Sequence, residues 1–440
     1  YSQALPGEST RHKEIYIIKI MKKLFLICMV FWIGCITISQ SIHQIQLEEN
    51  RVKTSPNLSK VKIGLDVLLD KHLELIQNKS IGLVTNQTGL DGNGKPNYEQ
   101  FLTLDNVDLK IIFSPEHGLF GEAAAGEKVK YNGQFKTLPK VVSLYGKNRK
   151  PTQEQLAGIE IILYDIQDIG ARFYTYISTM GLVMEAAAES GIHVIVLDRP
   201  NPITGKHMEG PILDLSYQSF VGYYPIPIRY GLTVGELSKM IVGEKWISHL
   251  PDLTVIPIEN WQRSQWVDES NLPWVKPSPN IPDLETALIY PGMCLLEATN
   301  LNEGRGTTKP FKQFGAPWID KQLLSIALNN LNLPGVAFKP ISYIPISIPG
   351  MSNNPHFKDE KCHGVELVIT DRNKYVSVDT GLNVLKTVAK LYPNELKFNE
   401  KWMEKLWGQS GLPELISDNT NIIKKPNQFQ TIALKYLLYD

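Results

Sequence analysis

The sequence predicts an α/β protein in which a Rossmann-like domain with a mainly parallel sheet is joined to a smaller α/β C-terminal domain. Short apolar runs that end abruptly in polar, turn-forming residues lie at 81–84, 110–113, 159–164 and 193–197. Continuous apolar runs of this length suit strands buried on both faces of a parallel sheet. Because open α/β sheets bind ligands beyond the carboxyl ends of their strands, these runs also predict a cleft at that edge, extending to the domain junction.

Helical patterns separate these strands. Apolar residues in the stretch 178–190 recur at helical spacing, with Ser178 or Thr179 as its N-cap and Gly191 as its stop. Capping boxes predict further helix starts at Thr152 with Gln155 and at Thr233 with Glu236. Strands and helices in this alternation form right-handed crossover units of a parallel sheet.

The composition changes near Asn260. The stretch 261–291 is rich in Pro and Trp, which predicts a connector, because proline interrupts both helices and central strands. Beyond it we expect strands at 337–347 and 364–370 and helices at 382–391 and 401–407. We therefore place the Rossmann-like catalytic domain at 60–285 and the C-terminal domain at 286–440, with a boundary anywhere between about 260 and 290.

Charge and size restrict the class of partner. The chain has 440 residues, 43% of them hydrophobic, so it can bury a sizeable core. Its 45 basic and 45 acidic side chains cancel, which argues against nucleic acid, a membrane surface or a polyanion as the main partner. Specificity must therefore come from a local site.

The N-terminal region predicts export. Lys22 and Lys23 precede a short apolar run, as in a secretory signal at 21–41, and residues 1–20 are interpreted as an extension before the natural start. Cys35 ends the apolar run, which favours a lipoprotein signal with an acylated cysteine over cleavage after Ser41. An uncleaved anchor is the remaining alternative, although the run is short for a spanning helix.

The remaining cysteines predict no chemistry. Cys294 and Cys362 are too few for a disulfide framework and wrongly spaced for a zinc site. A single disulfide between them and two buried free thiols are equally compatible with the sequence.

Glu116 is the first candidate catalytic residue. It lies between Pro115 and His117-Gly118 at the end of a predicted strand, where Pro ends the strand and Gly permits a tight turn. A carboxylic acid shielded by the apolar residues around it would have a raised pKa and act as a general acid, with His117 beside it. The alternative is a Glu or His that caps the next helix.

Asp165 and Asp168 follow another strand and are candidates for a second carboxylate. Aspartates at strand ends are also frequent helix caps, and that reading has equal weight for each of them. We expect neither a metal nor a cofactor. The ligands that a metal needs are missing at suitable spacing, and no G-x-G-x-x-G motif follows any predicted strand.

Aromatic, amide and guanidinium groups around these strand ends suit a sugar ligand, because its C–H faces pack on rings and its hydroxyls need fixed donors and acceptors. A buried aromatic cluster with a paired arginine is the alternative. The candidate binding residues are Asn86, Arg172, Tyr174, Tyr176, Asp198, Arg199 and Asn201.

A polar, glycine-rich loop at the domain junction supplies a second side of the site. Two glycines bracket Arg305 and allow unusual backbone angles there. Asn300, Glu303 and Arg305 are its candidate binding residues, and a solvated loop is the alternative.

Several long motifs resemble the exo-β-N-acetylmuramidase family, formerly a family of unknown function. They are SPEHGLFG at 114–121, YDIQDIGARFYTY at 164–176, LDRPNP at 197–202, EGP at 209–211, YPIPIRYGLT at 224–233 and EATNLNEGRGTTKPF at 297–311. The resemblance covers nearly all of 60–440. It implies a Rossmann-like domain joined to a smaller C-terminal domain, release of N-acetylmuramic acid from the non-reducing ends of peptidoglycan fragments, and Glu116 as the catalytic residue. Tyr230, in the fifth motif, joins the candidate binding residues.

The resemblance and the residues lead to one mechanistic hypothesis. Glu116 protonates the leaving oxygen, and Asp165 or Asp168 acts as base, nucleophile or orienter of the acetamido group. Arg172, Arg199 or Arg305 would clamp the lactyl carboxylate.

Two alternative functions remain open. One is another cell-wall hydrolase, an amidase or esterase, although no G-x-S-x-G motif is present. The other is an envelope lipoprotein that binds cell-wall fragments without catalysis, since the same aromatic and arginine groups would support it.

Overall fold

The computed structural model describes residues 60–440 except 125, 128–137 and 419–425. The predicted start extension at 1–20, the signal at 21–41 and Cys35 lie outside the described residues. Residues Lys60–Asp440 belong to one compact unit. Within the ranges described, no helix combines the length and the apolar character needed to span a bilayer.

The first sheet has six strands in the order β3-β2-β1-β4-β5-β6, all parallel to their neighbours. The strands are β1 (Lys79–Thr85), β2 (Val107–Ser114), β3 (Lys140–Ser143), β4 (Ile161–Asp165), β5 (His193–Leu197) and β6 (Leu253–Ile256). The order reverses between β1 and β4, which is the topological switch point of a Rossmann-like fold. The predicted fold class is confirmed, and the predicted strands are the four central ones.

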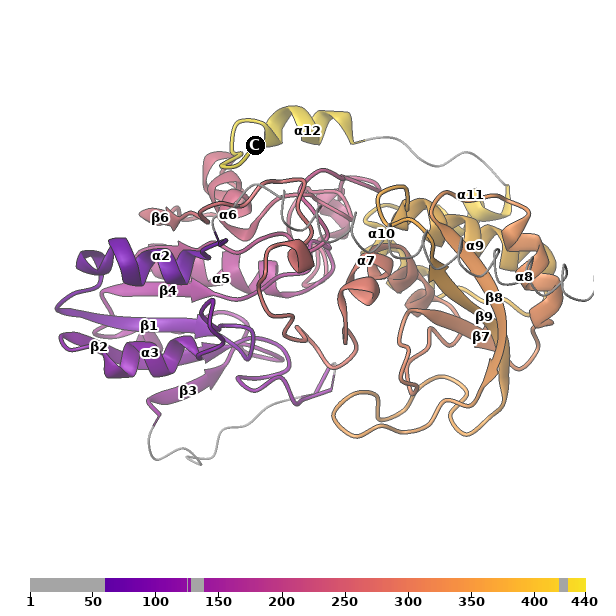
Figure 1. Ribbon diagram of the computed structural model, residues 1–440, viewed down its shortest axis with the longest axis horizontal. Helices are drawn as coiled ribbons and strands as arrows, with labels where there is room; N and C mark the ends of the chain where they lie inside the picture. Colours follow the sequence, from indigo (N-terminus) through magenta and orange to yellow (C-terminus); the bar gives the residue numbers. More distant parts are fainter. Residues whose placement is uncertain (1–59, 125, 128–137, 419–425) are drawn as a thin grey trace, which may run out of the picture. The chain divides into compact units, whose positions relative to one another are not determined.

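Helices cover both faces of this sheet (Figure 1). In β4, Ile161 and Leu163 pack with helices α2 (Gly64–Lys71) and α3 (Asn97–Thr103). The alternate residues Ile162 and Tyr164 pack on the other face with α5 (Tyr176–Glu189) and α6 (Val234–Gly243). Since successive side chains of a strand point to opposite faces, both of which are buried here, the strands read as continuous apolar runs.

Both predicted capping boxes are present, at the starts of α4 (Gln153–Leu156) and α6. Helix α5 begins two residues before the predicted stretch 178–190, with Thr175 at its N-cap position. The Thr175 side chain makes no capping hydrogen bond, and its hydroxyl donates to Glu116 instead. Thr175 therefore occupies the N-cap position of α5 but uses its hydroxyl to bind Glu116.

The C-terminal part contains a second sheet, which is antiparallel and has the order β7-β9-β8. Its strands are β7 (Gln313–Ala316), β8 (Val336–Tyr343) and β9 (Cys362–Ile369), and its helices are α7 (Leu284–Met293), α8 (Lys321–Asn329), α9 (Ser377–Leu391), α10 (Glu400–Trp407) and α11 (Leu412–Ser417). Strand β8 ends at Tyr343, before the predicted limit at 347. Cys294 and Cys362 are buried free thiols.

The chain end returns to the first sheet. Tyr436, just after helix α12 (Asn427–Ala433), donates to Glu244 just after α6 at 2.7 Å. The Tyr439 hydroxyl donates to Asp198 at the end of β5 at 2.6 Å. The last residues of the chain are therefore packed against the Rossmann-like part.

Candidate active site

Glu116 lies in the turn after β2, where its carboxylate is half-buried. One carboxylate oxygen accepts the Thr175 hydroxyl at 2.8 Å, and the other accepts the Gly126 N–H at 3.1 Å. Burial and the neighbouring Glu116 raise the pKa of Tyr145 in the loop after β3. The carboxyl group is therefore fixed in direction by donors from two separate segments, the turn that carries Gly126 and the residue before α5.

His117 is buried beside Glu116 with a positive φ of 70°. Its Nδ1 lies 2.7 Å from the carbonyl oxygen of Ala123, so Nδ1 carries the proton in this contact. Burial lowers the pKa of His117, against the opposing effect of Glu116. A neutral imidazole that ties down the turn after Glu116 fits this environment.

Glu116 and His117 line a pocket of about 410 Å³. Both parts of the chain contribute to it: the turn after β2, the loop after β3 and the start of α5 on one side, and segments on both sides of α7 and in α10 on the other. The aromatic lining consists of Tyr145, Phe173, Tyr174, Tyr176, Phe220, Tyr290, Phe311 and Trp402. A concave site that combines many rings with acidic and basic side chains matches the requirements of a charged saccharide.

Tyr174 and Tyr176 are the two predicted aromatic residues that the structure places in this pocket. Their rings pack edge to face with centroids 4.8 Å apart. The Tyr176 hydroxyl donates to the Pro277 carbonyl at 2.5 Å, whereas the buried Tyr174 hydroxyl has no hydrogen-bond partner among the described residues. The Tyr174 hydroxyl is thus an unpaired buried donor in a residue that lines the pocket.

Arg305 and Glu297 bring the glycine-rich loop into the same pocket. Arg305 forms ion pairs with Glu297 at 2.7 Å and with Glu303 at 2.9 Å, and its guanidinium lies 5.2 Å from the Phe311 ring centroid. Burial raises the pKa of Glu303, although Arg305 opposes that effect. Glu303 does not line the pocket, so its role in the geometry is to hold Arg305.

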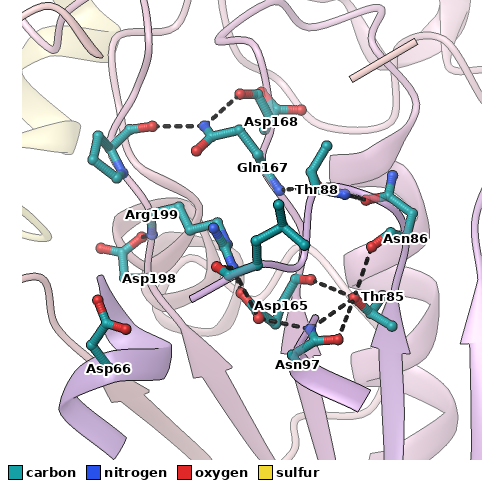
Figure 2. Close-up of polar contacts among 12 residues, drawn as sticks. Asp66, Thr85, Asn86, Thr88, Asn97, Asp165, Gln167, Asp168, Asp198 and Arg199 are labelled. Atoms are coloured by element: carbon teal, nitrogen blue, oxygen red, sulfur yellow. Dashed lines mark hydrogen bonds and ion pairs between the residues drawn. The ribbon is translucent and has the colours of Figure 1, made fainter. Parts of the chain in front are cut away.

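Asp165 lies outside this pocket, in a polar network at the switch point between β1 and β4 (Figure 2). The carboxylate is fully buried and pairs with Arg199 through Nε at 2.6 Å and Nη2 at 3.0 Å. Asn97 donates to the same carboxylate at 2.7 Å, and Thr85 donates to the Asp165 carbonyl at 3.1 Å. Protein side chains thus occupy the crevice in which many Rossmann-like folds bind their ligand.

Asp168 is buried on a neighbouring turn and also lies outside the pocket. It accepts the Tyr230 hydroxyl and, at 2.7 Å, the Gly170 N–H, while its Oδ1 has no partner among the residues described. Burial raises the pKa of Asp168 to about 7. Catalytic roles for Asp165 and Asp168, and a binding role for Tyr230, remain predictions that this geometry does not support.

Asp198 and Asn201 organise the turn after β5. Asp198 accepts the Thr233 hydroxyl and the Gly235 N–H, both at 2.7 Å, at the start of α6. Asn201 donates to the Leu232 carbonyl at 2.9 Å. Both side chains are buried and lie away from the pocket. For Asp198 this agrees with the alternative that a strand-end aspartate caps the next helix.

Arg172 is fully buried and does not reach the pocket. Its guanidinium donates to four backbone carbonyls, those of Pro211, Ile226, Leu406 and Trp407, at 2.7–2.9 Å. The last two acceptors belong to α10, so Arg172 joins the two parts of the chain. With Arg199 in its ion pair, neither arginine is free to clamp a carboxylate ligand.

Asn86 and Asn300 likewise make structural contacts. The Asn86 Oδ1 accepts from Thr88 at 2.6 Å, and its Nδ2 has no partner that meets hydrogen-bond geometry among the described residues. Figure 2 shows Asn86 at the edge of the switch-point network. Asn300 donates to the Glu395 carbonyl at 2.9 Å and accepts the Lys397 N–H at 2.9 Å, so it fixes the loop that carries Arg305.

Several pocket residues were not predicted: Tyr145, Arg149, Thr175, Phe220, Ser278, Asn280, Tyr290, Glu297, Phe311, Trp402 and Lys405. Thr175, Glu297 and Phe311 lie inside the quoted motifs, so the motifs contained a usable signal for them. Arg149 and Lys405 lie in stretches without a motif, and only the folded chain brings them to Glu116.

One potential metal site occurs among the described residues, in which Glu185, Glu189 and His249 have ligand atoms within 4.8 Å of one another. Lys150 forms ion pairs with the two carboxylates, at 2.9 and 2.7 Å, so a cation already occupies their side of the cluster. The cluster is not part of the pocket around Glu116.

Comparison with known proteins finds that both parts of the chain match models of one family. Family models described as "Exo-beta-N-acetylmuramidase NamZ, N-terminal" and "Exo-beta-N-acetylmuramidase NamZ, C-terminal" match residues 81–285 and 288–439. The chain is 44% identical over 388 residues to the peptidoglycan beta-N-acetylmuramidase NamZ of Bacillus subtilis (strain 168), covering 86% of this chain and 92% of the relative.

Solved structures agree with this comparison. Two crystal structures of DUF1343 family proteins from Bacteroides fragilis NCTC 9343 are similar to the chain, with TM-scores of 0.79 and 0.69 and identities of 35% and 31%. They cover 88% and 87% of this chain and 100% and 99% of their own chains.

Proposed function

The chain belongs to the exo-β-N-acetylmuramidase NamZ family, and from that premise we propose that it releases N-acetylmuramic acid from the non-reducing ends of peptidoglycan fragments. The observation that carries the proposal is the position of Glu116. Its carboxylate is fixed by Thr175 and Gly126 at the wall of an aromatic-lined pocket. A positioned carboxylic acid beside a sugar-sized pocket is the central requirement of a glycoside hydrolase.

In this mechanism Glu116 protonates the glycosidic oxygen as the bond to the anomeric carbon breaks. Thr175 and Gly126 hold the carboxyl group in one orientation, so that its proton is directed at the leaving oxygen. His117, buried and neutral, fixes the turn that carries Glu116.

Glu297 is the second carboxylate in our proposal. Glu116 and Glu297 are the two acidic residues that line the pocket among the residues described, and Arg305 holds Glu297 in place at 2.7 Å. A carboxylate at the sugar stabilises the positive charge that develops at the anomeric carbon, or activates a water or attacks directly. This assignment takes the place of the one that the sequence favoured for Asp165 or Asp168.

A chromogenic 4-nitrophenyl β-glycoside of N-acetylmuramic acid tests the proposal. The wild-type protein should release 4-nitrophenol, and Glu116→Gln should lose most of that activity because the amide cannot donate the proton. Equal turnover by the two proteins would refute Glu116 as the acid. Absence of turnover by the wild type, combined with binding of N-acetylmuramic acid in calorimetry, would favour the non-catalytic binding protein instead.

The anomeric form of the first product, followed by proton NMR, reports the reaction class. Retention requires a covalent or neighbouring-group intermediate, whereas inversion requires a water positioned opposite the leaving group. Glu297→Gln should then lose activity in either case.

We also propose that the protein is exported, as a periplasmic or membrane-anchored lipoprotein, because peptidoglycan lies outside the cytoplasm. The support is the charged, then apolar segment from Met21 to Cys35. Fractionation of cells expressing the full chain and its Cys35→Ser variant tests both statements. An anchored protein should move from the membrane to the soluble exported fraction on substitution, and recovery of both proteins in the cytoplasm would contradict export.

A further inference from the structure

The charged groups of the pocket divide into a paired set and an unpaired set. Arg305 lies between two carboxylates, Glu297 at 2.7 Å and Glu303 at 2.9 Å. Arg149 and Lys405 line the same pocket, and neither has an ion-pair partner within the described ranges. The positive charge available to a ligand therefore comes from Arg149 and Lys405, since Arg305 is already more than neutralised.

Of these two exposed cations, Arg149 is the one that stacks on an aromatic ring. Its guanidinium carbon lies 4.2 Å from the centroid of the Phe220 ring, a cation–π contact that holds the plane of the group. Phe220 in turn packs against Tyr145 with ring centroids 6.2 Å apart, and Tyr145 and Glu116 line the same pocket. Ring contacts thus hold the guanidinium on the wall that also carries Tyr145, while its edge N–H groups stay available.

The substrate class in the proposed function has one feature that suits this group. N-acetylmuramic acid differs from N-acetylglucosamine by a lactyl ether that ends in a carboxylate. A planar guanidinium binds a carboxylate through two parallel N–H bonds, which gives geometric selection as well as energy. Lysine is a flexible point charge and lacks that fork.

The space around Arg149 can accommodate such a substituent. Arg149, Ser219 and Phe220 line both the pocket and an adjoining hollow of about 480 Å³. Lys147 and Lys150 also line this hollow, but Lys150 is paired with Glu185 and Glu189. Arg149 therefore borders both the pocket and the space into which a side group of the sugar could extend.

We propose that Arg149, stacked on Phe220, binds the lactyl carboxylate and thereby selects muramic acid over glucosamine substrates. The inference rests on the proposed function, because it assigns the substrate-selecting group of that same pocket. It also places the carboxylate clamp on an arginine outside every recognisable motif, since Arg172 and Arg199 are bound to protein acceptors.

The test compares 4-nitrophenyl β-glycosides of N-acetylmuramic acid and of its lactyl methyl ester, which lacks the negative charge. The wild type should prefer the acid about 10- to 100-fold in kcat/KM, as expected for one charge-assisted bidentate pair. Arg149→Gln should use the acid and the ester with equal efficiency. Lys147→Gln, a matched loss of charge two residues away that lines only the hollow, should keep the wild-type preference.

Three results would overturn the proposal. Arg149→Gln could keep the preference for the acid over the ester, or Lys405→Gln could lose this preference while Arg149→Gln keeps it. Lys147→Gln could also lose the preference to the same extent as Arg149→Gln. Calorimetry keeps the inference testable if the wild type proves inactive. Free N-acetylmuramic acid should bind the wild type more tightly than N-acetylglucosamine, and Arg149→Gln should bind the two sugars equally. Inactivity with this binding pattern would refute the proposed hydrolysis alone, whereas equal binding of both sugars by the wild type would refute the carboxylate clamp.

Discussion

The variant Asp165→Asn distinguishes a structural role of Asp165 from a catalytic one. A structural role predicts a loss of stability with activity retained, and a catalytic role predicts a loss of kcat with stability retained. The Asp165 carboxylate is fully buried, and the side chain of its partner Arg199 is 7% exposed. The substitution removes the negative charge and leaves a buried guanidinium with only neutral acceptors, the amide oxygen and the Leu90 carbonyl at 2.8 Å. Asn97 and Arg199 both donate to Oδ2 of Asp165. An amide NH₂ group in the place of this oxygen would face two donors without an acceptor.

Removing one partner of a buried ion pair costs about 3–5 kcal/mol. The amide oxygen still accepts one hydrogen bond, so we expect about 3 kcal/mol, which is a factor of about 150 in the folding equilibrium. Urea unfolding followed by tryptophan fluorescence measures this loss. The double variant with Arg199→Met should be less destabilised than the sum of the two single variants, because it removes the unpaired charge.

The matched control is Glu160→Gln, at the other end of the same strand, where the exposed pair with Lys79 is 2.9 Å long. This variant should unfold at the wild-type urea concentration, because exposed pairs contribute little. At 25 °C the folded Asp165→Asn protein should keep kcat/KM on the muramic glycoside within about threefold of wild type, as expected for a group remote from the pocket. Wild-type stability with a 1000-fold loss of kcat would refute the reasoning and make Asp165 catalytic.

The opposite pattern is expected for Glu116→Gln, which should lower kcat about 100- to 10,000-fold without lowering stability; unfolding of this variant would contradict a purely chemical role. Arg172→Met should lower the free energy of unfolding by about 3–5 kcal/mol, because it removes a buried group with four carbonyl acceptors, and should leave the acid-over-ester preference intact. Burial raises the pKa of Asp168 from 3.8 to about 7. Between these two pH values the carboxyl is protonated in the folded protein and ionised in the unfolded chain. The free energy of unfolding therefore falls by about 1.4 kcal/mol for each unit by which the pH rises from about 4 to 7. Asp168→Asn should therefore flatten the dependence of stability on pH between about 4 and 7, and an unchanged slope in urea unfolding across this range would show that Asp168 is not the titrating group.

The sequence predicted the central part of the fold well, for a local reason. Strands β1, β2, β4 and β5 are buried on both faces, so they appear as uninterrupted apolar runs. The edge strands β3 and β6 were not predicted, because their half-exposed residues give no such run. The capping boxes at Thr152 and Thr233 were recognisable because each depends on residues three apart.

The candidate site was predicted less evenly. Glu116 was recognised because a turn sequence and a strand end coincide there, and Arg305 because two glycines bracket it. Asp165, Asp168 and Asp198 share the same local pattern, yet the structure uses them in buried networks. A strand-end aspartate and its partner are far apart in sequence, as Asp165 and Arg199 are, so no local pattern distinguishes a buried pair from a ligand contact.

The sequence by itself therefore determined the α/β class, the family resemblance and the position of Glu116, because each depends on short-range patterns of burial, turns and motifs. Tertiary structure alone decided which charged groups reach the ligand. It paired Arg172 and Arg199 with protein acceptors, bracketed Arg305 with two carboxylates, and left Arg149 unpaired on Phe220. The physical reason is that the availability of a charge depends on partners contributed by distant segments, which only the folded chain brings within contact.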